Sequence, residues 1–187
     1  GHYPQSWEYS TIGGWVASRS SGQQSLGYGR IEQLFAGARV ETLSGRLEIP
    51  SLPASAAGLD MREVILGSEG RMGIITDVTV RVSQEPELEY FETLGLPSWE
   101  IGVAFSRDVA QQRIPLSMLR LSNPLETASH IAMTGDSRSL SKIGIGNVRI
   151  TYGITGSNDH CLSTRDRLGE LAKKYGISPS DIYRNDE

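Results

Sequence analysis

The sequence has a single cysteine, Cys161, in 187 residues. One thiol excludes an internal disulfide and any zinc site that needs several thiolates, and such cysteine usage is typical of a reducing compartment. No stretch approaches the ~18 consecutive apolar residues of a membrane span, and the N-terminal residues lack the basic and apolar regions of a signal peptide. We therefore expect a cytoplasmic protein with no integral membrane segment, in which Cys161 is a buried small hydrophobe.

Clusters of positive charge are missing as well. The 18 lysines and arginines are scattered among 22 acidic residues, which gives a net charge of −4. The sequence therefore predicts no basic patch that would bind a nucleic acid or an anionic membrane, and a small molecule is the expected partner. Histidine is scarce, and His130 and His160 have no metal-ligand partner at a useful spacing, which predicts surface histidines and no metal site.

Glycine, in contrast, gathers in two segments, "TIGGWVASRSSG" at 11–22 and "GSEGRMG" at 67–73. Neither segment matches the glycine pattern of a dinucleotide-binding turn or of a P-loop. Glycine crowded before a strand indicates a backbone with positive φ, or one that another group approaches more closely than a Cβ would allow. The residues leave two interpretations open: a tight turn, or two loops that present backbone N–H groups to an anionic or amide-rich ligand.

The first half of the chain predicts short elements joined by irregular segments. Residues 10–30 are rich in glycine and serine, which predicts a long loop with one helical turn at 15–18. Two apolar runs, 34–42 and 46–49, predict a hairpin with Gly45 in its turn.

A short helix and a strand complete this half. The helix is predicted in "LDMREVILG" at 59–67, where Gly67 is a left-handed stop. Its candidate buried residues are Leu59, Val64 and Leu66. The strand that follows the second glycine segment is predicted to be half buried, because apolar and polar residues alternate along it. The residues predicted to share its apolar face are Ile74, Val78, Val80 and Val82.

Strands and helices alternate in the second half, so we place a domain boundary near residue 86. The predicted strands are 88–94, 116–121 and 148–154, with a loop at 135–147. The predicted helix caps are Ser98, Asn123 and either Ser157 or Asn158, with Gly176 as a helix stop. The order β-α-β-(α)-β-α predicts a split α+β sandwich that lacks its last strand. The predicted fold class is therefore α+β.

The segments "YPQSWEYSTIGGWVASRSSG", "YGRIEQLF" and "GLDMREVILGSEGRMGIITDVTVRV", all within residues 3–82, resemble the FAD-binding domain of vanillyl-alcohol-oxidase/PCMH-type flavoproteins. Within that superfamily, "PQSWEYSTIGGWV" and "IPLSMLRLSN" are similar to alkyldihydroxyacetonephosphate synthases and their bacterial relatives. The resemblance implies the C-terminal part of the FAD-binding domain in residues 1–86 and an incomplete, ferredoxin-like substrate-binding cap in 87–187. It also implies a larger flavoenzyme, with a diphosphate-binding loop upstream and catalytic tyrosine and histidine residues downstream.

The resemblance implies FAD as the cofactor and assigns its contacts to three segments. These are Gln5, Ser6, Trp7, Glu8, Tyr9, Ser10 and Thr11; Ser18, Arg19, Ser20 and Ser21; and Glu69, Gly70, Arg71, Met72, Gly73, Ile74 and Ile75. The glycines would let main-chain amides approach the flavin, and Ser10 and Thr11 would add hydroxyl hydrogen bonds. Arg71 stands where many members have threonine, and Glu69 has the alternative interpretation of a carboxylate that ties its own loop.

Arg120 is the candidate catalytic residue. In an extended strand, Arg120 lies on the same face as Leu116, Met118 and Ser122. Placing a guanidinium on an apolar strand face costs free energy unless the charge is paired. One interpretation is a salt bridge to a neighbouring acid. The resemblance implies the other, an arginine that lies beside the flavin and acts on the substrate, since its planar fork suits a phosphate or carboxylate.

The function that the resemblance implies is an alkyldihydroxyacetonephosphate-synthase-like transferase of lipid biosynthesis. It would exchange an acyl for an alkyl group on a lipid-like ketone phosphate through a flavin N5 adduct, as a monomer or a homodimer, and the fragment alone would be inactive. A first alternative is a FAD-dependent 2-hydroxy-acid dehydrogenase or oxidase, against which Trp15 argues because many such enzymes have asparagine there. A second is a non-catalytic binding module that lost the cofactor, against which the intact glycines argue.

Overall fold

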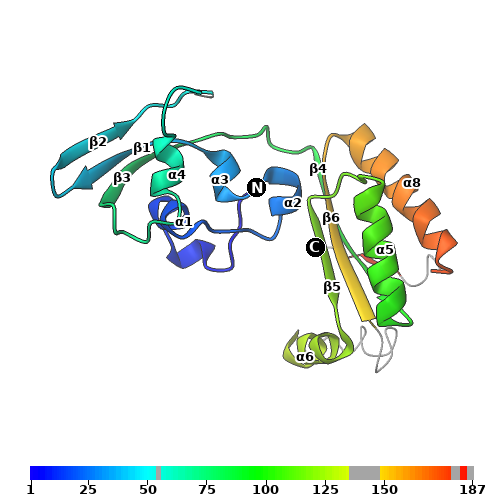
Figure 1. Cartoon of the computed structure of the whole chain (residues 1–187). Coiled ribbons are helices and arrows are strands. Elements are labelled where there is room, and N and C mark those ends of the chain that lie inside the picture. The colour runs from blue at the N-terminus through cyan, green and yellow to red at the C-terminus, as the bar shows by residue number, and fades with distance from the viewer. Residues whose placement is uncertain (54–55, 135–147, 178–181, 185–187) are drawn as a thin grey trace. The chain divides into compact units, whose positions relative to one another are not determined.

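The computed structural model describes residues 1–53, 56–134, 148–177 and 182–184, so the predicted loop at 135–147 lies outside the described residues. The chain forms two compact units, Gly1–Gln84 and Glu85–Glu187. Each unit has its own antiparallel sheet and its own hydrophobic core, and Figure 1 labels most of the elements.

The first unit contains a three-stranded sheet in the order β2-β1-β3. Its strands are β1 (Phe35–Thr42), β2 (Gly45–Ile49) and β3 (Ile74–Val80). The predicted hairpin is confirmed, because β1 and β2 pair antiparallel and Gly45 has a φ of 127° in the turn. Strand β3 pairs antiparallel with the other edge of β1.

The predicted long loop at 10–30 is wrong, because most of this segment is helical. The helical elements of the first unit are a 3₁₀ turn (Trp7–Tyr9), α1 (Ile12–Ser18), α2 (Ser25–Tyr28), α3 (Ile31–Leu34) and α4 (Met61–Ile65). Thr11 caps α1, and its Oγ1 accepts a hydrogen bond of 3.1 Å from the N–H of Gly14. Short helices rich in glycine and serine have weak intrinsic propensity, so the complete burial of Val16 and Ile31 stabilises them.

Two predictions about buried residues in this unit are also wrong. Leu59 is 75% exposed, and Ile65 fills the core position instead. Ile74 is 74% exposed, whereas Ile75 packs against the core. The cause is a bulge in β3: Asp77 pairs with Arg39 and Ile75 pairs with Val40, so no residue of β1 is paired with Thr76 in the strand register. The bulge shifts the alternation by one residue, and sequence pattern alone does not reveal it.

The second unit is a four-stranded antiparallel sheet in the order β5-β6-β4-β7, with helices between its strands. The strands are β4 (Leu88–Leu96), β5 (Met118–Ser122), β6 (Val148–Gly156) and β7 (Ile182–Arg184). The helices are α5 (Trp99–Gln111), α6 (Pro124–Thr134) and α8 (Asn158–Lys174). This order of elements and strands is that of a ferredoxin-like α+β fold, as the resemblance implied.

The expectation that the last strand is missing is wrong. Strand β7 pairs antiparallel with the free edge of β4, with Thr93 opposite Tyr183. A strand of three residues is too short for apolar alternation to identify it. The predicted caps are confirmed: the side chains of Ser98, Asn123 and Ser157 each accept a backbone N–H from the first turn of α5, α6 and α8.

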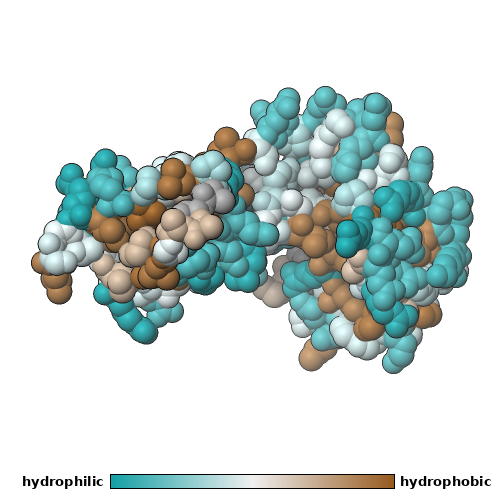
Figure 2. Space-filling model, turned by 45° about the horizontal axis from the view of Figure 1, so that its top comes forward, coloured by the Kyte–Doolittle hydropathy of each residue, from teal (hydrophilic) through white to brown (hydrophobic). Residues whose placement is uncertain are grey.

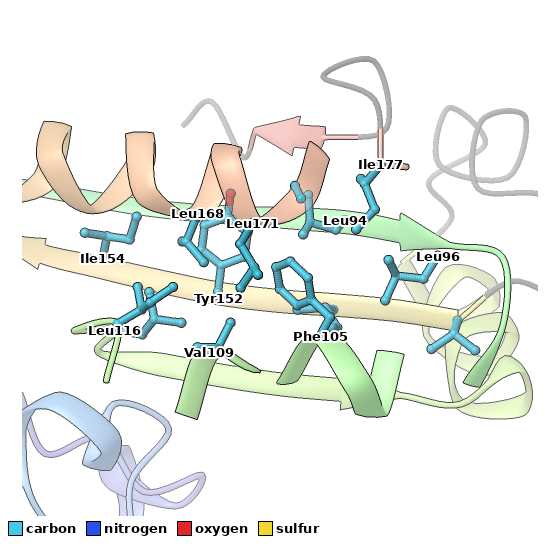
Figure 3. Close-up of a cluster of buried hydrophobic side chains, with 14 of the residues drawn as sticks. Leu94, Leu96, Phe105, Val109, Leu116, Tyr152, Ile154, Leu168, Leu171 and Ile177 are labelled. Carbon is cyan, nitrogen blue, oxygen red and sulfur yellow. The ribbon is translucent and has the colours of Figure 1, made fainter. Parts of the chain in front are cut away.

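The core of the second unit lies between one face of the sheet and the helices α5 and α8 (Figure 3). Phe105 of α5 and Leu168 of α8 point toward Leu94 and Tyr152 of the two central strands. Burying side chains of this size contributes ~1.5–3 kcal/mol each, so this layer holds the sheet in place. Cys161 is fully buried in the same core as predicted, and burial raises the pKa of its thiol.

Candidate functional site

The structure brings the two glycine-rich segments together in the first unit. The N–H of Gly67 donates to the carbonyl of Val16 at 3.0 Å, and the N–H of Glu69 donates to the carbonyl of Ala17 at 2.9 Å. A Cβ on Gly13 would be in ordinary contact with Ile75, 3.5 Å away. The C-terminal end of α1 therefore lies against the loop that precedes β3.

The loop 67–73 is built on left-handed backbone. Gly67, Glu69, Gly70 and Gly73 have φ values of 74°, 49°, 81° and 134°. The prediction that these glycines supply positive φ is confirmed. Gly73 has a further reason to be glycine, because a Cβ there would lie 2.4 Å from the carbonyl oxygen of Glu41 in β1. A Cβ on Gly70, in contrast, would meet nothing within 4 Å.

Two backbone N–H groups of this loop have no carbonyl acceptor among the described residues. The N–H groups of five loop residues, Gly67, Ser68, Glu69, Arg71 and Gly73, donate to carbonyl groups of the chain. Within the part of the chain that the structure describes, the N–H groups of Gly70 and Met72 donate to none, and both residues are exposed. Open space beside Gly70 and two unused donors fit a ligand rich in acceptor oxygens, such as the diphosphate and ribityl chain of FAD.

Most of the hydroxyl groups that the resemblance assigned to the cofactor form hydrogen bonds within the protein. Ser10 Oγ donates to the carbonyl of Ser6 at 2.7 Å and accepts from Trp15 Nε1 at 2.6 Å. Thr11 caps α1, and Ser18 Oγ donates to the carbonyl of Gly14 at 2.8 Å. These contacts explain why hydroxyl residues flank α1, and any contact that they make with the cofactor stays a prediction.

Arg19 joins the two glycine-rich segments from the end of α1. It adopts a left-handed φ of 51°, donates from Nε to the carbonyl of Leu66 at 3.3 Å and pairs with Glu63 at 2.7 Å. Ser20 Oγ lies 2.8 Å from Nε2 of His2, whose pKa is lowered by burial and by the charged N-terminus. Arg19 and Ser20 therefore have structural contacts in addition to the predicted cofactor contact.

The other assigned side chains lie at the surface of the first unit. Exposed among them are Gln5, Ser6, Trp7, Glu8, Tyr9, Ser21, Arg71, Met72 and Ile74. Several are large and apolar, with Tyr9 exposed at 91%, and hydrophobic side chains are visible on the surface of this unit in Figure 2. Trp7, Tyr9, Met72 and Ile74 are therefore accessible for contact with a ligand or another chain segment.

Arg120 lies in β5 with its side chain 55% exposed, and it forms an ion pair with Glu126 in the first turn of α6. Leu119 and Leu121 point into the core, so Arg120 points to the opposite face of the sheet. The prediction of an apolar face around Arg120 is wrong, because the residue opposite Arg120 on the neighbouring strand is Thr151. The predicted salt bridge is present, and the catalytic role stays a prediction.

A cavity of about 290 Å³ in the second unit is lined by Glu92, Tyr152 and Arg165 among others. Glu92 accepts from Tyr152 Oη at 2.5 Å and pairs with Arg165 at 2.7 Å, and the Arg165 guanidinium stacks over Tyr90. These polar groups are paired with one another, which indicates a structural cluster that closes the edge of the core. The members of this cluster are far apart in the chain, so no local sequence pattern predicts it.

Some kinds of site are not found among the described residues. They contain no group of three or more histidine, cysteine or acidic residues that could hold a metal ion. No helix within the described ranges is long and apolar enough to cross a membrane. The side chain of His130 lies outside the described residues.

Known proteins resemble this chain in both sequence and fold. It is 39% identical over 122 residues to an alkyldihydroxyacetonephosphate synthase of Caenorhabditis elegans, covering 65% of this chain and 20% of the relative. It is 34% identical over 178 residues to an uncharacterized FAD-linked oxidoreductase of Escherichia coli O157:H7, covering 94% of this chain and 35% of the relative. A solved structure of alkyldihydroxyacetonephosphate synthase superposes with a TM-score of 0.85 at 26% identity, covering 98% of this chain and 35% of that one.

No protein-family model matches the chain. The chain spans about a fifth to a third of the length of the relatives that it matches. The fold similarity runs through both units, and the sequence similarity includes the glycine-rich segments described above. This chain is therefore a partial relative of the alkyldihydroxyacetonephosphate synthases and FAD-linked oxidoreductases.

Proposed function

We propose that the chain is part of a FAD-dependent enzyme that exchanges the acyl group of an acyl ketone phosphate for the alkyl group of a fatty alcohol. The observation that carries the proposal is the fold match to alkyldihydroxyacetonephosphate synthase, which covers 98% of the chain with a TM-score of 0.85. A match of this extent includes both the unit with the glycine-rich loop and the unit with Arg120. The substrate is then a lipid-like ketone phosphate, and the exchange involves no net oxidation.

In this proposal the first unit holds the cofactor. The N–H groups of Gly70 and Met72 donate to its acceptor oxygens, and the left-handed backbone of the loop keeps these donors in a fixed geometry. Gly70 leaves open space that a side chain would narrow. When bound, the flavin supplies a ring system that accepts and returns an electron pair.

The second unit holds the substrate. Arg120 presents a guanidinium on the exposed face of its sheet, and two parallel N–H donors suit a phosphate group. We propose that Arg120 orients the ketone phosphate by this contact, which fixes the position of the reacting carbon.

A second candidate function is the oxidation of a 2-hydroxy acid with the same cofactor. It is favoured by the matches to D-2-hydroxyglutarate dehydrogenases, which cover 49% of the chain. An arginine on an exposed sheet face would bind the carboxylate of such a substrate as readily as a phosphate. The two functions therefore share both the cofactor loop and Arg120, and they differ in whether the substrate loses electrons.

The experiment that separates them uses the longer protein that this proposal requires, purified with its flavin. An acyl dihydroxyacetone phosphate should bleach the flavin absorbance without oxygen uptake and without an external electron acceptor. A 2-hydroxy acid such as D-lactate should leave the spectrum unchanged. Bleaching by D-lactate that an added acceptor reverses, with no response to the acyl ketone phosphate, would establish the second function and reject the first.

We also propose that the 187-residue chain alone binds FAD weakly and is inactive, because its loop offers few donors to so large a ligand. Titrating FAD against this chain should leave the flavin fluorescence nearly unchanged. Stoichiometric quenching would contradict this. The single, fully buried cysteine supports a reducing, cytoplasmic location, which tagging of the longer protein in cells would test.

A further inference from the structure

Arg19 ends α1 in a backbone conformation that glycine normally supplies. Its φ is 51° and its ψ is 48°, which is the left-handed region. Many helices end in this conformation, and glycine is preferred there because a Cβ makes the conformation unfavourable. An arginine in this place costs conformational free energy, so contacts of its side chain are expected to offset that cost.

The side chain of Arg19 contacts the start of the loop 67–73. Its Nε donates to the carbonyl of Leu66 at 3.3 Å, and its Nη2 lies 2.7 Å from Oε2 of Glu63 in α4. A Cβ on Gly67 would lie only 3.1 Å from Cγ of Arg19, so the missing side chain leaves room for the arginine stem. Arg19 therefore holds both α4 and the first residue of the loop against the end of α1.

The backbone at the end of α1 binds the same loop. The last four carbonyl groups of an α-helix have no partner within the helix. Here the carbonyl of Val16 accepts from the N–H of Gly67, and the carbonyl of Ala17 accepts from the N–H of Glu69. Gly70, whose N–H we assign to the cofactor, follows Glu69 directly in the chain. The position of that donor therefore depends on how the loop is held at α1.

The contacts of Arg19 make it a poor partner for an anionic ligand. Two of its three guanidinium nitrogens, Nε and Nη2, are already engaged by the carbonyl of Leu66 and the carboxylate of Glu63. The carboxylate also compensates the positive charge that a diphosphate would seek. These contacts fit a residue that acts on the loop better than one that acts on the ligand.

We propose that Arg19 is a positioning residue for the cofactor. It holds the loop 67–73 in the shape that presents the N–H groups of Gly70 and Met72 to FAD, and it does not bind FAD itself. Donors that are held in place before binding lose less conformational freedom when the ligand binds, which raises the affinity. The role of FAD rests on the proposed function, whereas the grip of Arg19 on the loop rests on the contacts described above.

The first test measures amide hydrogen exchange by NMR in the 187-residue chain, with no flavin present. Arg19→Gly should speed the exchange of the Gly67 and Glu69 N–H groups several-fold, because the loop opens more often. Arg113→Gly is the matched control. Arg113 has a similar left-handed φ of 49°, and its side chain forms no hydrogen bond or ion pair among the described residues. Glycine relieves the same backbone strain at both positions, so only the lost contacts of Arg19 distinguish the two variants.

The second test titrates FAD into the flavin-free form of the longer protein. Arg19→Gly should weaken FAD binding about tenfold or more, and Arg113→Gly should bind FAD as the wild type does. Glu63→Gln separates positioning from direct contact, because the two roles predict opposite signs. Loss of the ion pair loosens the loop and should weaken FAD binding several-fold. If Arg19 bound the diphosphate directly, removing the competing carboxylate would tighten FAD binding instead.

Three results would overturn the inference. These are equal FAD affinities in Arg19→Gly and Arg113→Gly, weaker FAD binding in Arg19→Gly with unchanged exchange at Gly67 and Glu69, and tighter FAD binding in Glu63→Gln. The wild-type titration reports on the proposed function separately. No FAD binding by the wild-type longer protein would reject that function, whereas FAD binding that Arg19→Gly leaves unchanged would reject the inference alone.

Discussion

The carbonyl oxygen of Glu41 in β1 occupies the space beside Gly73 so closely that a Cβ on Gly73 would lie 2.4 Å from it. Gly73 also has a φ of 134°, which side chains rarely adopt. The last glycine of the loop is therefore required by the packing of the loop against its own sheet, before any ligand is considered.

This contact predicts that Gly73→Ala destabilises the first unit by about 2 kcal/mol or more, through both the clash and the backbone strain. Gly70→Ala is the matched control, since it adds the same methyl group in open space and incurs only a left-handed strain of ~1 kcal/mol. Urea unfolding followed by tryptophan fluorescence measures both. Equal losses in the two variants would show that the contact with Glu41 has no energetic consequence.

The sequence pattern identified the glycines of this loop as sites of positive φ, because that property depends on the residue itself. It did not identify which group approaches them closely. The resemblance pointed to the flavin, and at Gly73 the structure shows a carbonyl of the same chain. Helix caps were predicted for the same reason as the glycines: Ser98, Asn123 and Ser157 act on N–H groups two or three residues away.

Features that depend on residues far apart in the chain could not be predicted from the sequence. The bulge at Thr76 reversed the expected faces of Ile74 and Ile75, because it is defined by pairing with β1 rather than by β3 itself. The ion pair between Glu92 and Arg165 likewise joins residues that are 73 positions apart in the chain. The resemblance could assign Arg120 because a local motif surrounds it, and no motif marks Glu92 or Arg165.

The buried ion pair of the second unit predicts an asymmetric response to mutation. The side chain of Glu92 is 4% exposed and that of Arg165 is 24% exposed. Arg165→Met removes the cation and leaves a buried carboxylate, which should destabilise the unit by about 3 kcal/mol in urea unfolding. Lys173→Met, which breaks the exposed pair with Glu170, should cost less than ~1 kcal/mol. A comparable loss in the two variants would contradict this description of the cluster.

Asp108 predicts a pH dependence of the same unit. Hydrogen bonds from Lys174 and then from Tyr175 hold the pKa of its carboxyl below the usual value. A carboxyl with a lowered folded pKa stabilises the fold above its unfolded pKa of ~3.9, and this contribution is lost as the pH falls through the folded pKa. The free energy of unfolding should therefore decrease between about pH 5 and pH 3, and less so in Asp108→Asn. Parallel curves for the two proteins would exclude Asp108 as the cause.

The last prediction separates the two interpretations of Arg120. Its ion pair with Glu126 joins side chains that are 55% and 39% exposed, so it contributes at most ~1 kcal/mol to stability. Arg120→Lys keeps the charge for that pair and should leave the urea midpoint of the 187-residue chain unchanged. If Arg120 binds a substrate anion with its planar fork, the same change in the longer flavoenzyme should lower kcat/KM by about 2–4 kcal/mol in transition-state stabilisation. The FAD content should stay normal, because the proposed cofactor contacts lie in the first unit. Turnover at the wild-type rate would show that Arg120 serves the salt bridge alone, since only the substrate contact depends on two parallel N–H donors.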